Sequence, residues 1–198
     1  MKTVTGLFET YEEGRDAVSA LEAAGVPSSD ISIVANNAAD SYEDERTEAA
    51  EGAGLGAGIG AVIGGAGGLL AGLGLMAIPG VGPVVAAGWL VAALTGAAAG
   101  AVVGGAGGGM VGALIKSGIP ETHAHAYAEG IRRGGTLVTA RVEDSLAPRA
   151  ESILQQSRVN IEDRRRTYTQ EGWEKFDDTL PPYTKEEVER ERDRLGGM

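Results

Sequence analysis

Residues 52–115 read GAGLGAGIGAVIGGAGGLLAGLGLMAIPGVGPVVAAGWLVAALTGAAAGAVVGGAGGGMVGALI, a stretch of 64 residues without a charged side chain. Glycine recurs there every fourth residue, and Ala92 keeps the same step. These positions are Gly52, Gly56, Gly60, Gly64, Gly68, Gly72, Gly88, Gly96, Gly100, Gly104, Gly108 and Gly112. A spacing of four places residues on one face of an α-helix, where glycine allows a second helix to approach closely. The spacing therefore predicts two helices that pack through glycine zippers.

A turn divides this stretch. Residues 78–83 read IPGVGP, and the prolines and glycines Pro79, Gly80, Gly82 and Pro83 are typical of a turn. We therefore expect helices over 52–77 and 85–115, about 39 and 46 Å long. Both exceed the hydrocarbon core of a bilayer, about 30 Å. Trp89 would lie near the distal membrane interface, where tryptophan is favoured.

The first 36 residues predict a β-α-β unit. Residues 3–8 and 31–35 have the composition of short strands. Thr10 and Glu13 have the spacing of a helix-capping box, and Gly25 is expected to end the helix that they begin.

A second β-α-β unit is predicted after the glycine-rich stretch. A helix should run from Pro120 through Arg133, because proline is tolerated in a first turn and Gly134-Gly135 stops it. A strand over 137–142, a helix over about 145–157 and a short strand over 159–161 complete the unit.

Two such units predict an α+β fold of the split ferredoxin-like type, with a four-stranded sheet and helices on one face. A long glycine-zipper helical hairpin interrupts it. The expected parts are residues 1–39 and 116–163 as two halves of one domain, 40–51 as an acidic linker, 52–115 as the hairpin and 164–198 as a charged tail with a short helix. The expected core consists of Phe8, Val18, Leu21, Ile31, Ile33, Val138, Val142, Ile153, Leu154 and Ile161.

The expected hairpin is more typical of a segment that inserts into a membrane. If both halves share one sheet, Glu51 and Lys116 lie on the same side of a bilayer, so the segment must cross it an even number of times. The absence of charge and the length favour insertion. The strongly apolar residues are sparse, however, so a hairpin buried in an oligomer stays open, and a flexible glycine-rich linker is a third alternative.

The amino-acid composition excludes some kinds of site and argues against one class of partner. The chain has no cysteine, which excludes disulfides and thiolate metal sites. Its net charge of −11 argues against nucleic acid as a partner.

No catalytic, cofactor-binding or metal-binding constellation is evident. His123 and His125 are two residues apart on an expected helix and so point in different directions. The glycines of residues 104–109 lack the Gly-Lys-Ser/Thr ending of a phosphate-binding loop. We therefore expect no enzyme and no cofactor.

The tail offers two further features. Arg164-Arg165-Arg166 could touch anionic lipid, although Glu162 and Asp163 balance the run and favour a solvated face. Trp173, Phe176 and Tyr183 are expected to dock on the domain itself, and Thr184 with Glu187 forms a capping box for a last helix.

Together these segments resemble bacterial general stress proteins of the heat-induced or low-temperature-induced type. The resemblance rests on TVTGLFETYEEGRDAVSALEAAG (3–25), ISIVANN (31–37), IPGVGP (78–83) and GIPETHAHAYAEGIRRGGTLVTARV (118–142). The tail segment GWEKFDDTLPPYTKEEVERER (172–192) is similar to tails of some members. The resemblance implies a stress-associated protein with no established reaction, so no catalytic residue is carried over.

The sequence as a whole predicts a non-enzymatic stress protein that inserts into or associates with a membrane and self-assembles through its glycine faces. Its partners would be a lipid bilayer and further copies of the chain, with the α+β domain in the cytoplasm. The alternatives are a soluble cytoplasmic homo-oligomer with the hairpins in its core, a small-ligand-sensing module and, less favoured, a pore.

Overall fold

The computed structural model describes residues 1–38, 74–100, 109–156 and 159–196; the side chains of residues 95–100 and 196 are not among what it describes. The chain folds as a mixed α+β structure around a five-stranded antiparallel sheet. The strands are β1 (Lys2–Phe8), β2 (Ile31–Asn36), β3 (Gly74–Ile78), β4 (Gly82–Gly88) and β5 (Thr136–Val142). The helices are α1 (Tyr11–Ala23), α3 (Trp89–Gly100), α4 (Gly109–Lys116), α5 (Glu121–Arg132), α6 (Ala147–Leu154), α7 (Ile161–Gln170) and α8 (Lys185–Gly196), with a short 3₁₀ turn at Ser28–Asp30.

The sheet has the strand order β1-β5-β2-β4-β3. Strand β5 lies between β1 and β2 and runs antiparallel to both, with Val4 opposite Ala140 and Ile33 opposite Val138. Strands β1 and β2 therefore run in the same direction, as the crossover through α1 requires. On its other side β2 pairs with β4, and β3 forms the far edge.

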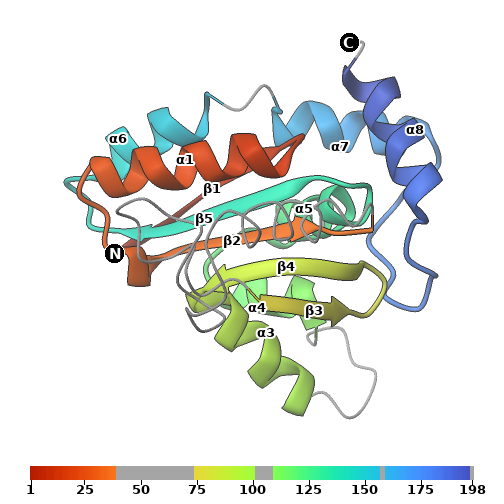
Figure 1. The fold of residues 1–198 in the computed structure, drawn as a ribbon, viewed down its shortest axis with the longest axis horizontal. Coiled ribbons are helices and arrows are strands. Elements are labelled where there is room, and N and C mark those ends of the chain that lie inside the picture. Colours follow the sequence, from red (N-terminus) through yellow and green to blue (C-terminus); the bar gives the residue numbers. More distant parts are fainter. Residues whose placement is uncertain (39–73, 101–108, 157–158, 197–198) are drawn as a thin grey trace, which may run out of the picture.

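Helices cover both faces of the sheet (Figure 1). Helices α1 and α6 pack on one face, and α3, α4 and α5 form a layer on the other. The expectation of helices on one face only was therefore wrong. The reason is that residues 89–116 supply two helices that bury apolar side chains such as Leu90 and Leu114 under the sheet, alongside α5.

The core beneath α1 and α6 agrees with the sequence prediction. It contains eight of the ten expected residues, namely Phe8, Val18, Leu21, Ile31, Ile33, Val138, Val142 and Leu154, and Ile153 packs against it while partly buried. Ile161 is the exception, because it packs against the second core, on the opposite face.

Helix α1 begins as the capping box predicts. The hydroxyl of Thr10 accepts a hydrogen bond from the Glu13 amide at 3.2 Å. The Glu13 carboxylate in turn accepts from the amides of Glu9 and Thr10. These bonds satisfy amides at the helix start that have no partner within the helix.

The predicted helical hairpin over 52–115 was wrong in its centre. Residues 74–78 and 82–88, expected at the end of one helix and the start of the next, form β3 and β4 instead. The second helix also begins later than expected, at Trp89; α3 (Trp89–Gly100) and α4 (Gly109–Lys116) are described, and residues 101–108 lie outside the described residues. The described residues contain no helix both long and apolar enough to span a bilayer.

Two physical factors explain this difference. A spacing of four is also a multiple of two, so the same glycine positions share one face of a strand as well as one face of a helix. Glycine costs about 1 kcal/mol relative to alanine within a helix, whereas β4 gains a full ladder of hydrogen bonds along β2. The partner strand decided the conformation, and the spacing alone could not reveal it.

The chain turns between Ile78 and Gly82, but the turn joins two strands and not the two helices that were expected. Gly80 and Gly82 have φ angles of 73° and 96°, which favour glycine. Pro79 lies in the turn, and Pro83 falls in β4 opposite Ala77 of the edge strand.

The remaining zipper glycines have mixed positions. Gly52, Gly56, Gly60, Gly64, Gly68, Gly72, Gly104 and Gly108 lie outside the described residues. Gly96 and Gly100 lie in α3, and Gly112 is buried in α4. Gly88 ends β4 with a φ of 93°, so its predicted place in a helix was wrong. Packing through these glycines stays a prediction.

Two further expectations needed correction. Trp89 does not lie at a distal interface: its indole NH donates to the Asp30 carbonyl at 3.1 Å, and Arg141 stacks on its ring at 4.8 Å. The last predicted strand is a single bridge between Val159 and Leu7, because Asn160 caps the start of α7 and turns the chain into a helix.

Replacing Gly88 with alanine tests the strand assignment. A Cβ atom there would lie 2.1 Å from the Ile31 carbonyl oxygen. We expect Gly88→Ala to lower the free energy of unfolding by about 2 kcal/mol or more, measured by urea titration. In a helix interior the same change would raise it by about 1 kcal/mol, so stabilisation would contradict the fold.

Gly172→Ala is the matched control. Gly172 also has a positive φ, 88°, but nothing lies within 4 Å of its added Cβ. The Gly172→Ala variant should lose only the free energy of holding alanine at a positive φ, about 1 kcal/mol of unfolding free energy.

Candidate functional site

A pocket of about 230 Å³ opens where β1 and β2 end and α1 begins. Its lining comes from five separate parts of the chain: Thr10, Tyr11, Glu12, Ala35, Asn36, Asn37, Val85, Gly134, Thr136 and Arg192. Polar side chains predominate, and Ala35 and Val85 supply an apolar wall. We call it the β2-end pocket.

Backbone contacts fix the walls of this pocket. The Asn37 amide donates to the Pro83 carbonyl at 2.9 Å, which ties the end of β2 to β4. The Asn36 side chain accepts from the Ala38 amide at 2.8 Å and donates to the Arg132 carbonyl at 3.4 Å. Thr136 is buried at the start of β5. The pocket is therefore set by the sheet and the chain segments that enter and leave it.

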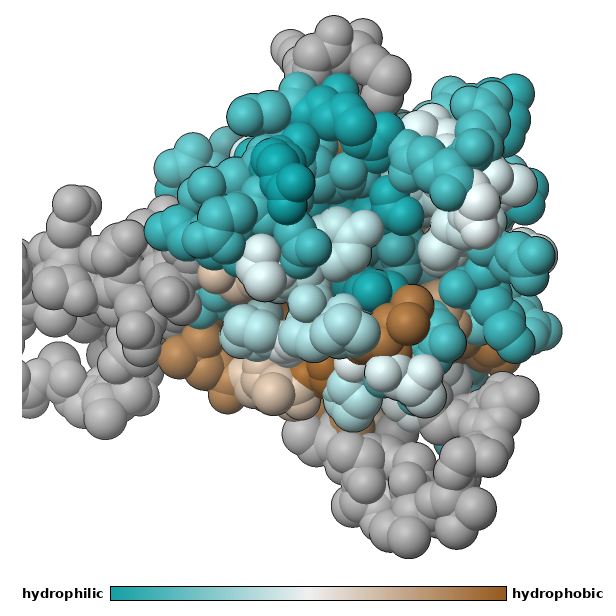
Figure 2. All heavy atoms as spheres, turned by 90° about the vertical axis from the view of Figure 1, so that its right-hand side faces the viewer, coloured by the Kyte–Doolittle hydropathy of each residue, from teal (hydrophilic) through white to brown (hydrophobic). Residues whose placement is uncertain are grey.

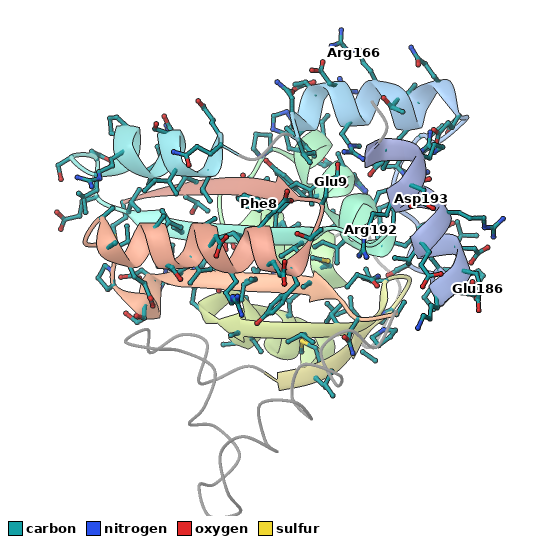
Figure 3. The ribbon with its side chains drawn as sticks, turned by 45° about the horizontal axis from the view of Figure 1, so that its top comes forward. Phe8, Glu9, Arg166, Glu186, Arg192 and Asp193 are labelled. Atoms are coloured by element: carbon teal, nitrogen blue, oxygen red, sulfur yellow. The ribbon has the colours of Figure 1, made fainter. Side chains whose placement is uncertain are left out.

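Arg192, from α8, is the one cationic side chain among the lining residues that the structure describes. Figure 3 shows Arg192 reaching from α8 toward the end of the sheet where α1 starts, whereas Glu186 lies on the outer side of the same helix. Its Nη2 donates to the Gly134 carbonyl at 3.4 Å, and its Nε is buried without a hydrogen-bond partner among the described residues. The guanidinium forms no ion pair with any carboxylate in the part of the chain that the structure describes.

A buried ionic cluster holds α8 in this position. Arg133, at the end of α5, contacts three carboxylates: Glu129 at 2.7 Å, Glu171 at 2.7 Å and Glu191 at 3.0 Å. The Glu129 side chain is 2% exposed and that of Glu191 10%. Glu191 directly precedes Arg192, so the cluster sets the rotation of α8 about its axis.

The pKa values follow this arrangement. Burial alone would lower the pKa of Arg133, but hydrogen bonds to Glu129, Glu171 and Glu191 outweigh burial and raise it. Burial alone would raise the pKa of Glu191, yet hydrogen bonds from Arg194 and Arg133 lower it below its usual value of 4.5. Both partners therefore stay ionised at neutral pH.

Aromatic residues of the tail dock around the same cluster. The Arg133 guanidinium lies 4.1 Å from the centre of the Tyr168 ring, and Trp173 meets that ring edge-on at 5.7 Å. Arg132 lies 5.2 Å from the Tyr183 ring. Phe176 is buried in the core under the sheet. The tail is thus packed on the domain, as its aromatic residues suggested.

The tail also contacts the β3–β4 turn. A Cβ atom at Gly80 would lie 2.6 Å from the Cα of Asp178, and one at Gly82 would lie 2.7 Å from the Cβ of Pro182. These close approaches require glycine and lock the turn beneath the tail. Figure 2 views this end of the molecule: hydrophilic residues dominate above, and hydrophobic residues gather below, on the side of β3 and β4.

Sequence reasoning singled out few residues of this site. Of the predicted helix-packing glycines, those that the structure describes do not line the pocket. The sequence identified Thr10 only as a helix cap. It did not identify Arg192, because α8 is far in the sequence from the other residues that line the pocket. The predicted charged features have ordinary partners: Arg164 pairs with Glu9, Arg165 with Glu162, and Arg166 with Asp163.

The two histidines have different partners. His123 contacts Glu162 at 2.5 Å, and His125 lies 3.9 Å from Glu121. Within the described ranges, no group of three or more His, Asp or Glu side chains is arranged to hold a metal ion.

Comparison with known families matches residues 3–82 to the family described as the heat induced stress protein YflT domain. The match runs from β1 to the first residue of β4. It confirms the resemblance to bacterial general stress proteins over these residues and indicates a stress-associated function. No curated protein and no solved structure is significantly similar to the chain.

Removing Arg133 should release the tail. Arg133→Met leaves the buried Glu129 and Glu191 without their shared cation, and we expect a loss of about 3 kcal/mol or more of unfolding free energy. Trp173 fluorescence should shift as its contact with Tyr168 is lost. The measurement is urea unfolding followed by fluorescence.

Arg166→Met is the matched control. The Arg166 side chain is 71% exposed, and its pair with Asp163 is on the surface, so stability should not change measurably. Equal stability of the two variants would mean that the Arg133 cluster does not hold the tail.

Proposed function

We propose that this chain is a non-enzymatic, stress-associated protein that binds a small polar molecule in the β2-end pocket. The observation that carries the proposal is a pocket in which five described chain segments meet, with the Arg192 guanidinium, whose Nε has no hydrogen-bond partner among the described residues. Pockets with an apolar wall and a few convergent polar groups are the usual sites of small ligands.

The fold of the core supports a binding role. The proposed core is the split ferredoxin-like arrangement, in which β1, β5 and β2 form the central order and Val159 stands where a fourth strand would pair with β1. Strands β4 and β3 extend this core beyond β2. The pocket opens at the ends of β1 and β2 that precede helix α1 and the glycine-rich segment.

Ligand binding would also connect the pocket to stress. A ligand that binds only the folded state raises the free energy of unfolding in proportion to the logarithm of its concentration. Because α8 contributes Arg192 to the lining, a bound ligand would stabilise the docked tail together with the sheet. A protein of this kind would become more heat-resistant as its ligand accumulates.

A second candidate is association with a membrane and self-assembly through the glycine-rich segment. Residues 52–73 carry no charge and keep glycine at every fourth position. The flanks of this segment enter the same sheet at β2 and β3, so a crossing would have to occur twice, which needs about 40 apolar residues. This candidate therefore takes the form of shallow insertion or of assembly between copies.

Membrane fractionation tests the second candidate. If it holds, native protein should stay in a carbonate-washed membrane pellet, and replacing Gly60 and Gly64 with leucine should abolish self-assembly because close helix approach is blocked. If the protein stays in the washed pellet but Gly60→Leu and Gly64→Leu leave the size of its oligomer unchanged, membrane association is supported and assembly through the glycine faces is rejected. Release of the full chain by carbonate would reject insertion.

A thermal-shift screen of small polar metabolites tests the binding proposal. We expect at least one compound to raise the melting temperature of the protein, and Ala35→Val to remove that effect, because two added methyl groups project into the pocket. Ala77→Val is the matched control: it makes the same change in the exposed edge strand β3. Stabilisation that survives Ala35→Val would place the ligand elsewhere, and a screen without any hit would reject the proposal.

A further inference from the structure

We infer that the ligand of the β2-end pocket is a small organic monocarboxylate whose carboxylate pairs with the Arg192 guanidinium. The inference rests on the proposed function, because it names the ligand class of the same pocket.

In the part of the chain that the structure describes, Arg192 lacks the carboxylate partners that several arginines near it have. Arg133 contacts three carboxylates, and Arg164 and Arg194 also pair with glutamates, whereas exposed Arg190 donates to a backbone carbonyl of its own helix. Among the described residues, Arg192 has only the Gly134 carbonyl as acceptor, at the long distance of 3.4 Å, and its buried Nε has none. A buried donor without an acceptor carries a free-energy cost, so an acceptor supplied by a ligand would be favourable.

The shape of the Arg192 guanidinium favours a carboxylate. A guanidinium presents Nε–H and Nη–H as a planar fork that matches the two oxygens of a carboxylate. Of the two donors of such a fork, Nε is the one without a partner here, and Nη2 makes the long bond that a ligand could replace. A carboxylate satisfies both at once, which a single hydroxyl or carbonyl oxygen does less well.

The charges around the pocket favour a ligand with a single negative charge. Among the described lining residues Arg192 is the only cation, and exposed Glu12 adds a negative charge. A doubly charged phosphate would meet one guanidinium and the repulsion of Glu12, whereas a monocarboxylate forms a neutral pair. The chain as a whole also carries a net charge of −11, which disfavours multiply charged anions.

The remaining lining describes the body of the ligand. The Ala35 and Val85 side chains offer apolar contact, and buried Asn37 and Thr136 border the space. A volume of about 230 Å³ is below the range of about 300 to 1,000 Å³ of pockets for drug-sized ligands, so the ligand is a small acid.

The packing of α8 fixes the backbone position of Arg192 before a ligand carboxylate binds. Its neighbour Glu191 is fixed by Arg133 at 3.0 Å, and Val188 and Leu195 of the same helix are buried. Little conformational freedom of α8 would therefore be lost on binding, which favours affinity.

Matched acid and amide probes test the inference on the full chain. Benzoate and propionate are compared with benzamide and propionamide by melting temperature and by ¹H–¹⁵N NMR shifts of Asn36 and Asn37, in about 0.15 M salt to screen long-range repulsion. We expect the acids to bind and to perturb these amides, and the amides of the same shape to bind about tenfold more weakly or worse.

Arg192→Gln should reduce the affinity for the acids to that of the amides, and Arg192→Lys should recover part of it, because lysine keeps the charge without the fork. Arg190→Gln is the control on the same helix: Arg190 is exposed and donates to the Glu186 carbonyl of its own helix. It should leave binding unchanged. If Arg192→Gln fails to fold, the Arg192→Lys variant and the acid-amide comparison decide alone.

Equal binding of acids and amides, or acid binding that Arg192→Gln leaves intact, would overturn the inference. If the acids do not bind but an uncharged compound from the thermal-shift screen does, in an Ala35-dependent way, the ligand class is wrong and the proposed function stands. If no compound binds in the pocket, both are wrong.

Discussion

The hydrogen-bond ladder between β2 and β4 is the constraint on which the rest of the structure depends. Without β4, the backbone of β2 from Ser32 to Asn36 would present an unpaired edge. With it, the chain returns from the glycine-rich segment into the same sheet that it left. The return places the β3–β4 turn under the tail, where Gly80 and Gly82 lie against residues 178–182. The docked tail then carries α8, and α8 supplies Arg192 to the pocket.

Charge is organised around this tail. The chain has a large excess of acidic side chains, and Arg133 gathers three of them into one buried cluster with Tyr168. Removing one partner of a buried ion pair leaves an uncompensated buried charge and strongly destabilises the fold, so we expect the cluster to hold the tail in place. Arg192 differs from Arg133 in having no carboxylate partner among the described residues, and the proposal that Arg192 binds a ligand starts from this difference.

Local signals in the sequence predicted local structure well. The capping box of Thr10 and Glu13, the apolar spacing of Val18 and Leu21, and the alternation in β5 identify elements whose conformation depends on near neighbours. The helix prediction failed at residues 74–88 because this segment pairs along the open edge of β2, a contact between distant parts of the chain that local spacing does not record. The short strand at Val159 failed because the Asn160 cap began α7 one residue later.

The pocket could not be predicted for a related reason. Its lining joins Thr10, Asn37 and Val85 to Arg192, which is brought near them only by the packing of the tail. Sequence reasoning did identify the aromatic residues that dock the tail, Phe176 and Tyr183 among them, but not the side of α8 that would face the sheet. That orientation follows from Glu191 and its contact with Arg133.

The most direct test of the account is a set of NMR contacts across β2 and β4. The account predicts cross-strand nuclear Overhauser effects between Ile33 and Ala87 and between Ala35 and Val85, together with slow amide exchange along β4 comparable with that of β5. Helical sequential contacts running unbroken from residue 85 into α3, with no contact to β2, would contradict it. In that case the sheet would end at β2, and the pocket would lose the wall that Val85 provides.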